Sequence, residues 1–225
     1  MEVTSQDIKF VPEAGFDAVS AILDRSESCR SLLVLGHGSG SNMRVPFIVG
    51  LSTALVNAGV ATFRYQFPYS ESADFIPYSD MDTDSPEVLA ATVRSAVGAA
   101  SDAEPDLPLF VGGHSVSGFT ASVADAALPL EDVKGLVVLG FPLKGDPRRA
   151  THLEGVSHPI LLLQGTDDEL GRIVEITEMV AGTTASIDVS FIESANHGFS
   201  VPGRDDIDVY EELGSRIAAW IDELI

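Results

Sequence analysis

The sequence predicts an α/β protein with a mostly parallel, doubly wound sheet and an antiparallel hairpin near the N-terminus. Short apolar runs alternate with longer segments of helical periodicity, the order that gives parallel strands covered by helices on both faces. Two of the runs, Ser31–Gly36 and Pro159–Gln164, are apolar almost throughout, as strands buried on both faces are. A third run, Pro108–Gly112, leads into Ser115 at a glycine-rich turn, which indicates a sharp strand-to-helix junction.

Length and composition predict one domain that spans residues 1–225, without a separate lid domain. The chain has 225 residues, of which 45% are hydrophobic, enough for a full core. No apolar run approaches the roughly 20 residues of a membrane span, and the N-terminus lacks the pattern of a signal peptide. Cys29 is the single cysteine, so no internal disulfide can form. We therefore expect a cytoplasmic location.

The charge balance excludes some partners. There are 34 acidic and 13 basic residues, a formal net charge of −21, and only three of the basic residues are lysines. Nucleic acids and anionic membrane surfaces would repel such a chain, so we expect neither as a partner. The acidic, lysine-poor composition resembles that of halophilic proteins, whose charges are screened by concentrated salt. The alternative is an acidic soluble protein without this adaptation.

The first half of the chain predicts four strands and two helices. The strands are Asp7–Pro12, a segment within Phe16–Arg25, Ser31–Gly36 and Val60–Tyr65, and the helices are Val45–Ala58 and Pro86–Ala100. Phe16–Arg25 fits a helix or a strand, and its position before a buried strand favours an antiparallel hairpin. Gly59 suits the end of the first helix, and Ser85 with Pro86 suits the start of the second.

The second half continues the alternation. It predicts strands at Leu107–Gly112, Val133–Gly140, Pro159–Gln164 and Ile187–Ile192, and helices at Val116–Leu128, Gly171–Val180 and Asp205–Ile225, with Trp220 in the core. Two connecting segments, Gln66–Ser85 and Phe141–His158, are long enough to cover a site.

The turn at Ser115 has the form of a nucleophile elbow. The usual pattern is Gly-x-Ser-x-Gly, which lifts a serine hydroxyl to the carboxyl end of a parallel sheet. Here the pattern is Gly113-His-Ser115-Val-Ser117, and a glycine follows only at position 118. Because serine is also small, we expect the turn to form.

A serine nucleophile needs a histidine base, and the histidine needs a carboxylate to orient it. Both follow Ser115 in the required order, each directly after a predicted strand: Asp168 after Gln164, and His197 after Ile192. Asp167 competes with Asp168 for the acid role, and we favour Asp168 from its spacing after the glycine at position 165. Glu169 is a weaker candidate, and one of the acids has the alternative role of capping the next helix.

The other histidines are less suited to be the base. His114 adjoins the serine but points differently along the turn, so we expect it to form part of the wall. His152 and His158 lie before a strand and are expected at the surface or in a loop. His37 belongs to a separate glycine-rich motif.

That motif, Gly36-His37-Gly38-Ser39-Gly40, is a candidate oxyanion loop. In this arrangement the backbone N–H after the nucleophile acts with one from a loop after an early strand. We assign Val116 and Ser39, with Gly38 as the alternative to Ser39. The motif lacks the Lys-Ser/Thr pair of a phosphate-binding loop, so nucleotide binding is disfavoured.

Together these motifs resemble the α/β-hydrolase superfamily, especially its small lidless members similar to dienelactone hydrolases. The resemblance extends to Phe63–Tyr69, Phe141–Gly145, Gln164–Asp168 and Asn196–Phe199, and it covers residues of about 30 to 221. The branch consists largely of uncharacterised predicted hydrolases. Its usual elbow has lysine where this chain has His114, and glycine where it has Ser117. The branch also includes a regulatory subunit of chromatin-modifying complexes, so the scaffold can serve without catalysis.

The sequence thus predicts a serine hydrolase that cleaves a carboxylic ester or thioester through an acyl-enzyme, with a small-molecule acyl substrate and no cofactor or metal. A non-catalytic binding protein on the same scaffold is the alternative. The oligomeric state is left open. Candidate substrate-binding residues are His37, Gly38, Arg64, Tyr65, Tyr69 and His114. Arg64 has the alternative role of a structural ion-pair partner.

Overall fold

The computed structural model describes residues 2–13, 15–71 and 84–225, and its strands form one eight-stranded sheet. The strand order is β1-β2-β4-β3-β5-β6-β7-β8. The strands are β1 (Thr4–Phe10), β2 (Val19–Arg25), β3 (Ser31–Gly36), β4 (Val60–Tyr65), β5 (Leu109–His114), β6 (Val133–Leu139), β7 (Ile160–Gly165) and β8 (Ile187–Ile192). From β4 to β8 all neighbours are parallel, whereas β1 pairs with β2, and β2 with β4, in antiparallel fashion.

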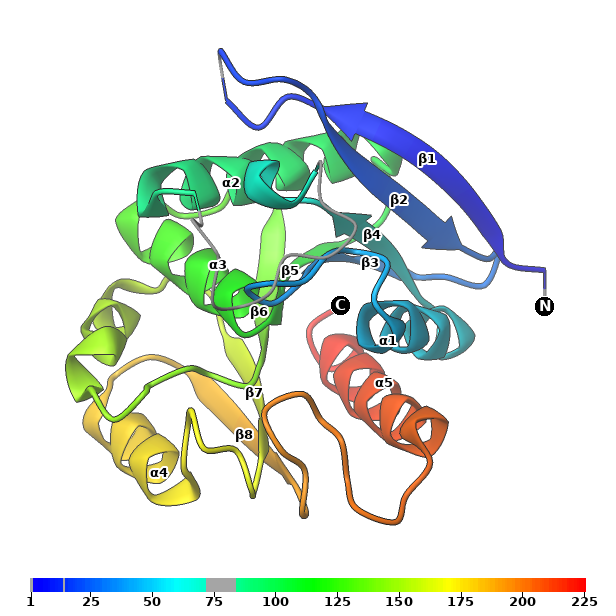
Figure 1. Cartoon of the computed structure of the whole chain (residues 1–225). Helices are drawn as coiled ribbons and strands as arrows, with labels where there is room; N and C mark the ends of the chain where they lie inside the picture. The colour runs from blue at the N-terminus through cyan, green and yellow to red at the C-terminus, as the bar shows by residue number, and fades with distance from the viewer. Residues whose placement is uncertain (1, 14, 72–83) are drawn as a thin grey trace.

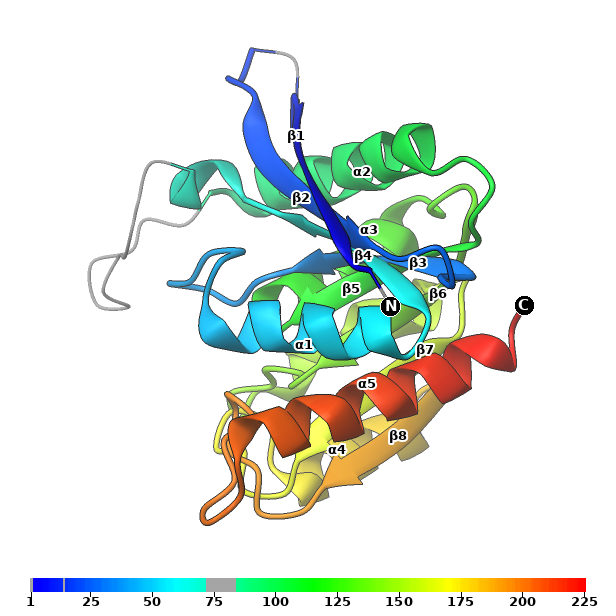
Figure 2. The same cartoon turned by 90° about the vertical axis from the view of Figure 1, so that its right-hand side faces the viewer.

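Helices cover both faces of this sheet (Figures 1 and 2). The elements are α1 (Pro46–Asn57), α2 (Pro86–Ala103), α3 (Val116–Ala127), α4 (Ile173–Gly182) and α5 (Asp206–Asp222), with the short 3₁₀ helices η1 (Pro68–Ser70) and η3 (Pro147–Gly155). Helices α1 and α5 pack side by side on one face, where Ile48, Leu51 and Leu213 join a buried cluster. Helices α2, α3 and α4 belong to the other face, which has its own cluster around Val93, Ala121 and Ile176.

The predicted fold class is confirmed, including the N-terminal hairpin, and the described residues contain no separate lid domain. The first strand begins at Thr4 rather than Asp7, because its ladder with β2 extends to the pair Thr4 and Arg25. Helix α4 begins at Ile173 rather than Gly171. A Cβ on Gly171 would lie 2.4 Å from the Phe141 carbonyl oxygen, so this residue is held in the loop, close to the segment that follows β6.

The parallel topology brings the carboxyl ends of β3, β5, β7 and β8 to one edge of the sheet. Of the two predicted covering segments, Gln66–Ser85 lies mostly outside the described residues, and Phe141–His158 contains η3. Among the described residues no helix is long and apolar enough to cross a bilayer.

A buried ion pair joins the N-terminal hairpin to the parallel part of the sheet. Arg64 on β4 contacts Asp24 on β2, with Nη2 and Nε at 2.6 and 2.8 Å from Oδ2. Both residues are buried, and Arg64 Nη1 also donates to the Met43 carbonyl at 2.8 Å. Hydroxyls of Ser5 and Ser52 donate to the same carboxylate. Arg64 therefore has the structural role that was the alternative to substrate binding.

The variant Arg64→Leu should lower the free energy of unfolding by about 3–5 kcal/mol, because it leaves the buried Asp24 carboxylate without its counterion. Urea unfolding measures this change. The matched control is Arg148→Leu, since Arg148 is paired with Asp146 but is exposed. This control should cost about 1 kcal/mol or less. Equal losses in the two variants would contradict the structural role of the Arg64 pair.

Candidate active site

Ser115 occupies a strained turn between β5 and α3. Its φ of 52° and ψ of −113° place it in a region that L-residues rarely adopt. Such strain persists only where the surrounding structure holds it, and it is common at functional sites. The predicted elbow is therefore present in the backbone.

Close backbone approach explains why the altered glycine pattern still gives this turn. A Cβ on Gly113 would lie 2.2 Å from the Gly36 carbonyl oxygen. Ser117 stands where the usual pattern has glycine, and its side chain fits because Gly36 lacks one: a Cβ there would lie 2.4 Å from Ser117 Cβ. The Ser117 hydroxyl donates to the His114 carbonyl at 2.9 Å. The next residue, Gly118, has the tight backbone contact, with 2.6 Å between an added Cβ and the Gly113 oxygen.

Three predicted side chains meet at the sheet edge. His197 Nε2 lies 2.9 Å from Ser115 Oγ, and His197 Nδ1 lies 2.7 Å from Asp168 Oδ2. A carboxylate only accepts, so Nδ1 carries the proton and Nε2 accepts from the serine hydroxyl. Asp168 and Ser115 are buried, and His197 is partly exposed.

The structure distinguishes Asp168 from its acidic neighbours. Asp168 Oδ1 accepts from the backbone N–H of Leu170 at 2.7 Å, and Oδ2 accepts from Gln164 Nε2 at 2.6 Å. Asp167 and Glu169 are exposed. Both oxygens of Asp168 are thus fixed, whereas the other two acids face solvent.

Gln164, to which the sequence pattern assigned no role, positions the Asp168 carboxylate. Its amide also donates to the Gly171 carbonyl at 2.9 Å, and its Oε1 accepts from the Phe141 N–H at 2.8 Å. The side chain therefore connects the loop after β7, which contains Asp168 and Gly171, to Phe141 in the segment after β6. The available signal was a polar residue at the end of an otherwise apolar strand, which is a costly placement unless it makes hydrogen bonds.

A cavity of about 360 Å³ opens beside Ser115 and His197. Gly38, Ser39 and His114, all candidates from the sequence, line it. The wall also includes Ser41, Val45, Phe47, Ile48, Lys144, Leu170 and Gly198. None of these described lining residues is a carboxylate, although the chain is strongly acidic.

The two predicted oxyanion donors occupy suitable elements. Val116 is the first residue of α3, where a backbone N–H has no partner within the helix. Ser39 follows β3, the strand next to β5, and lines the cavity. Both therefore lie at the same edge of the sheet as Ser115.

His114 and His37 lie at different depths. His114 lines the cavity, its Nε2 donates to the His197 carbonyl oxygen at 2.8 Å, and burial, with His197 as a second cause, lowers its pKa to about 4. His37 is fully buried behind the loop, where its Nδ1 donates to the Gly38 carbonyl oxygen at 2.9 Å. Burial lowers its pKa to about 4 as well.

The remaining substrate-binding candidates are not among the described lining residues of this cavity. Tyr65 is fully buried, and its hydroxyl has no hydrogen-bond partner among the described residues. Tyr69 stacks on Phe67 at a centroid distance of 5.8 Å, and burial raises its pKa. Arg64 is engaged by Asp24.

The other two histidines are partly buried and contact helix α3. His152 Nε2 lies 2.8 Å from the Ser122 hydroxyl, and His158 Nδ1 lies 2.8 Å from the buried Asp125 carboxylate. Both therefore make structural contacts, which the expectation of a surface or loop position did not include. Among the described residues, no group of three or more His, Cys, Asp or Glu side chains is arranged to hold a metal ion.

A mostly parallel eight-stranded sheet with a serine at a strained strand-to-helix turn defines an α/β-hydrolase fold. The chain belongs to this family: the model of an alpha/beta hydrolase domain matches residues 29–224.

Solved structures share the fold at low identity. A dienelactone hydrolase from Anabaena variabilis has a TM-score of 0.80 and 21% identity over 100% of both chains. An α/β serine hydrolase without a lid from Xanthomonas campestris has a TM-score of 0.72 and 16% identity over 96% of this chain and 94% of that one. A putative α/β hydrolase from Agrobacterium tumefaciens has a TM-score of 0.72 and 17% identity, over 97% and 95%.

The buried histidines predict a loss of stability below neutral pH. In the unfolded chain a histidine titrates near pH 6.5, whereas His37 and His114 have folded pKa values of about 4. Between these values the unfolded state binds more protons, so stability falls as pH falls. Each group contributes at most about 1.4 kcal/mol per pH unit, in the middle of this window.

Urea unfolding between pH 4.5 and 6.5 measures the slope. The variants His37→Gln and His114→Gln should each reduce it by one histidine's contribution, about 1 kcal/mol per pH unit averaged over this range. An unchanged slope in both variants would show that these histidines are not held neutral.

Proposed function

We propose that this protein is a serine hydrolase that cleaves a carboxylic ester or thioester through an acyl-enzyme. The observation that carries the proposal is the 2.9 Å contact between His197 Nε2 and Ser115 Oγ on a strained turn. A serine hydroxyl is a weak nucleophile until an adjacent base accepts its proton. The family and the names of its structural neighbours, which include esterases and serine hydrolases, support this class of reaction.

In the acylation step Ser115 Oγ attacks the substrate carbonyl carbon, and its proton passes to His197 Nε2. Asp168, at 2.7 Å from Nδ1, stabilises the imidazolium that forms. The tetrahedral intermediate then collapses, the bond to the leaving oxygen or sulfur breaks, and Nε2 returns the proton to that atom. Water repeats the sequence on the acyl-enzyme and regenerates the Ser115 hydroxyl.

The backbone N–H groups of Val116 and Ser39 are the proposed donors to the oxyanion. Donors of this kind are fixed before the reaction, so they stabilise the transition-state charge without reorganisation. Beside Ser115, a cavity of about 360 Å³ lies at the small end of the usual range for ligand sites, so a short acyl group fits best.

Labelling with a fluorophosphonate probe tests the nucleophile. Wild-type protein should be labelled at Ser115, and Ser115→Ala should lose the label, because the probe reacts only with an activated serine. The matched control is Ser122→Ala on α3, the helix that follows Ser115, which should keep the label. No labelling of folded wild-type protein would favour the alternative of a non-catalytic binding protein.

A pair of aspartate variants tests the acid. Asp168→Asn should lower kcat for an activated ester by about 10³- to 10⁴-fold, because the amide favours the wrong tautomer of His197. Asp167→Asn makes the same chemical change at the exposed neighbour and should stay within about threefold of wild type. Steady-state kinetics measures both, and the reverse ranking would assign the acid role to Asp167.

A further inference from the structure

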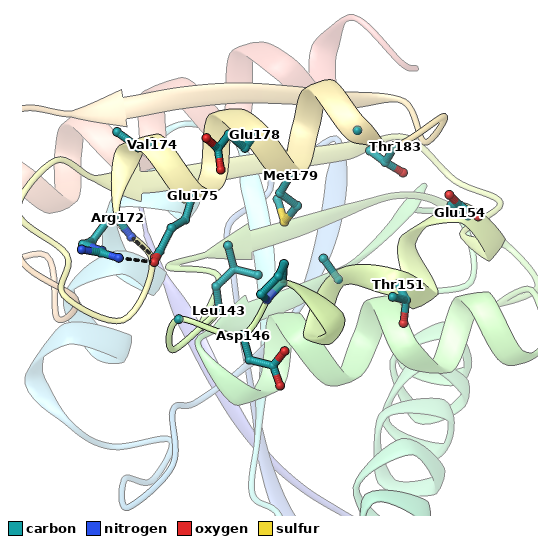
Figure 3. Close-up of a pocket in the computed structure, with 14 residues that line it drawn as sticks. Leu143, Asp146, Thr151, Glu154, Arg172, Val174, Glu175, Glu178, Met179 and Thr183 are labelled. Carbon is teal, nitrogen blue, oxygen red and sulfur yellow. Dashed lines mark hydrogen bonds and ion pairs between the residues drawn. The ribbon is translucent and has the colours of Figure 1, made fainter.

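A groove larger than the Ser115 cavity lies between α4 and η3 (Figure 3). Its volume is about 700 Å³, against about 360 Å³ for the cavity at Ser115. The two share no lining residue among those the structure describes. The groove is lined by Leu143, Gly145, Asp146, Pro147, Ala150, Thr151, Glu154, Arg172, Val174, Glu175, Glu178, Met179, Gly182 and Thr183.

The groove has an apolar floor because α4 is only loosely packed. The helix carries several large apolar residues, yet Ile176 is its one fully buried residue. Val174 is 67% exposed, and Met179, on the same helix, extends toward the space facing η3 (Figure 3). Ala150 provides apolar surface on the opposite side, where the buried side chain of Leu143 also lines the groove. A ligand with an apolar body would thus cover surface that the protein itself leaves open.

Four carboxylates line the groove: Glu175 and Glu178 on α4, and Asp146 and Glu154 on the side of η3. Arg172 and Arg148 pair with two of them, Glu175 and Asp146. The other two are Glu178 on α4 and Glu154 on η3, and neither forms an ion pair within the part of the chain that the structure describes. A positive charge on the ligand would be stabilised by either of these two carboxylates. By contrast, no carboxylate is among the described residues lining the Ser115 cavity.

We propose that the α4–η3 groove is a second ligand site, which binds a small organic cation with an apolar body, such as a quaternary or primary ammonium on an aryl or alkyl group. Its volume lies within the range of small-molecule sites, about 300–1,000 Å³. The site does not require the proposed hydrolase chemistry, because Ser115, His197 and Asp168 lie outside it.

Calorimetric titration with three matched probes tests the charge preference. The probes are phenylbutyl-trimethylammonium, phenylbutanol and phenylbutyl sulfonate, which share one apolar body and differ in charge. At an ionic strength of about 0.15 M, distant surface charges are largely screened. The ammonium should saturate one site and bind about tenfold tighter than the alcohol, with the sulfonate weakest. Equal binding of all three, or binding without saturation, would overturn the proposal.

Variants that leave the net charge unchanged locate the site. Met179→Trp fills the groove from α4, and Ala150→Leu fills it from η3, so at least one of these variants should be folded and informative. Each folded variant should bind the ammonium about tenfold more weakly, a change of about 1.4 kcal/mol. Wild-type affinity in a folded filled variant would overturn the proposal.

Variants that remove one carboxylate distinguish binding at the groove from a general attraction of the cation to the acidic chain. Glu178→Gln and Glu154→Gln should each weaken ammonium binding by about two- to fivefold, as expected for exposed ion pairs. The matched control is Glu211→Gln on α5, an exposed glutamate away from the groove, which should have no effect. Equal loss in the control would show that the probe only senses the overall charge.

The variant Ser115→Ala distinguishes this site from the proposed catalytic one. It should abolish fluorophosphonate labelling and leave ammonium affinity unchanged. Failure of the labelling therefore bears on the proposed function alone. If Ser115→Ala weakened ammonium binding as much as the filled variants do, the probe would occupy the Ser115 cavity, and the second site would be disproved.

Discussion

The close approach of β5 and α3 to the neighbouring strand β3 is the constraint on which the rest of the site depends. Ser115 takes a left-handed conformation there, and the helix leaves the strand without room for side chains at Gly36 or Gly113. The space that the usual glycine after the nucleophile would provide is supplied instead by Gly36 on β3. The absence of a side chain at Gly36 on the neighbouring strand thus accommodates Ser117, and the turn places the Ser115 hydroxyl at the carboxyl edge of the sheet.

Parallel strands then bring Asp168 and His197 close to Ser115. Asp168 and His197 follow β7 and β8, whose carboxyl ends lie at the same edge as that of β5. Each comes from a loop and is fixed by hydrogen bonds: Gln164 and the Leu170 N–H for Asp168, and Asp168 itself for His197. Rigid strands supply the position, and short polar contacts supply the orientation.

Sequence order was sufficient for the fold class and for the meeting of Ser115, Asp168 and His197, because strand alternation and parallel pairing determine which loops converge. It was insufficient for Arg64. A charged residue in an apolar strand indicates only that an ion-pair partner is needed. Asp24 lies 40 residues away, in a segment whose sequence fits a helix or a strand. The α4–η3 groove was equally hidden, since the apolar pattern of α4 looks the same whether its side chains are buried or open.

The hydrogen bond from His114 to the His197 carbonyl has a consequence for motion. His114 adjoins Ser115 in the chain, so this bond from the His114 side chain links the turn at Ser115 to the main chain of the loop at His197, across 83 residues of sequence. The hydrogen bond restrains the motion of one segment relative to the other, and with it the separation of Ser115 Oγ and His197 Nε2. Part of the entropy of aligning the two groups is then lost when the chain folds.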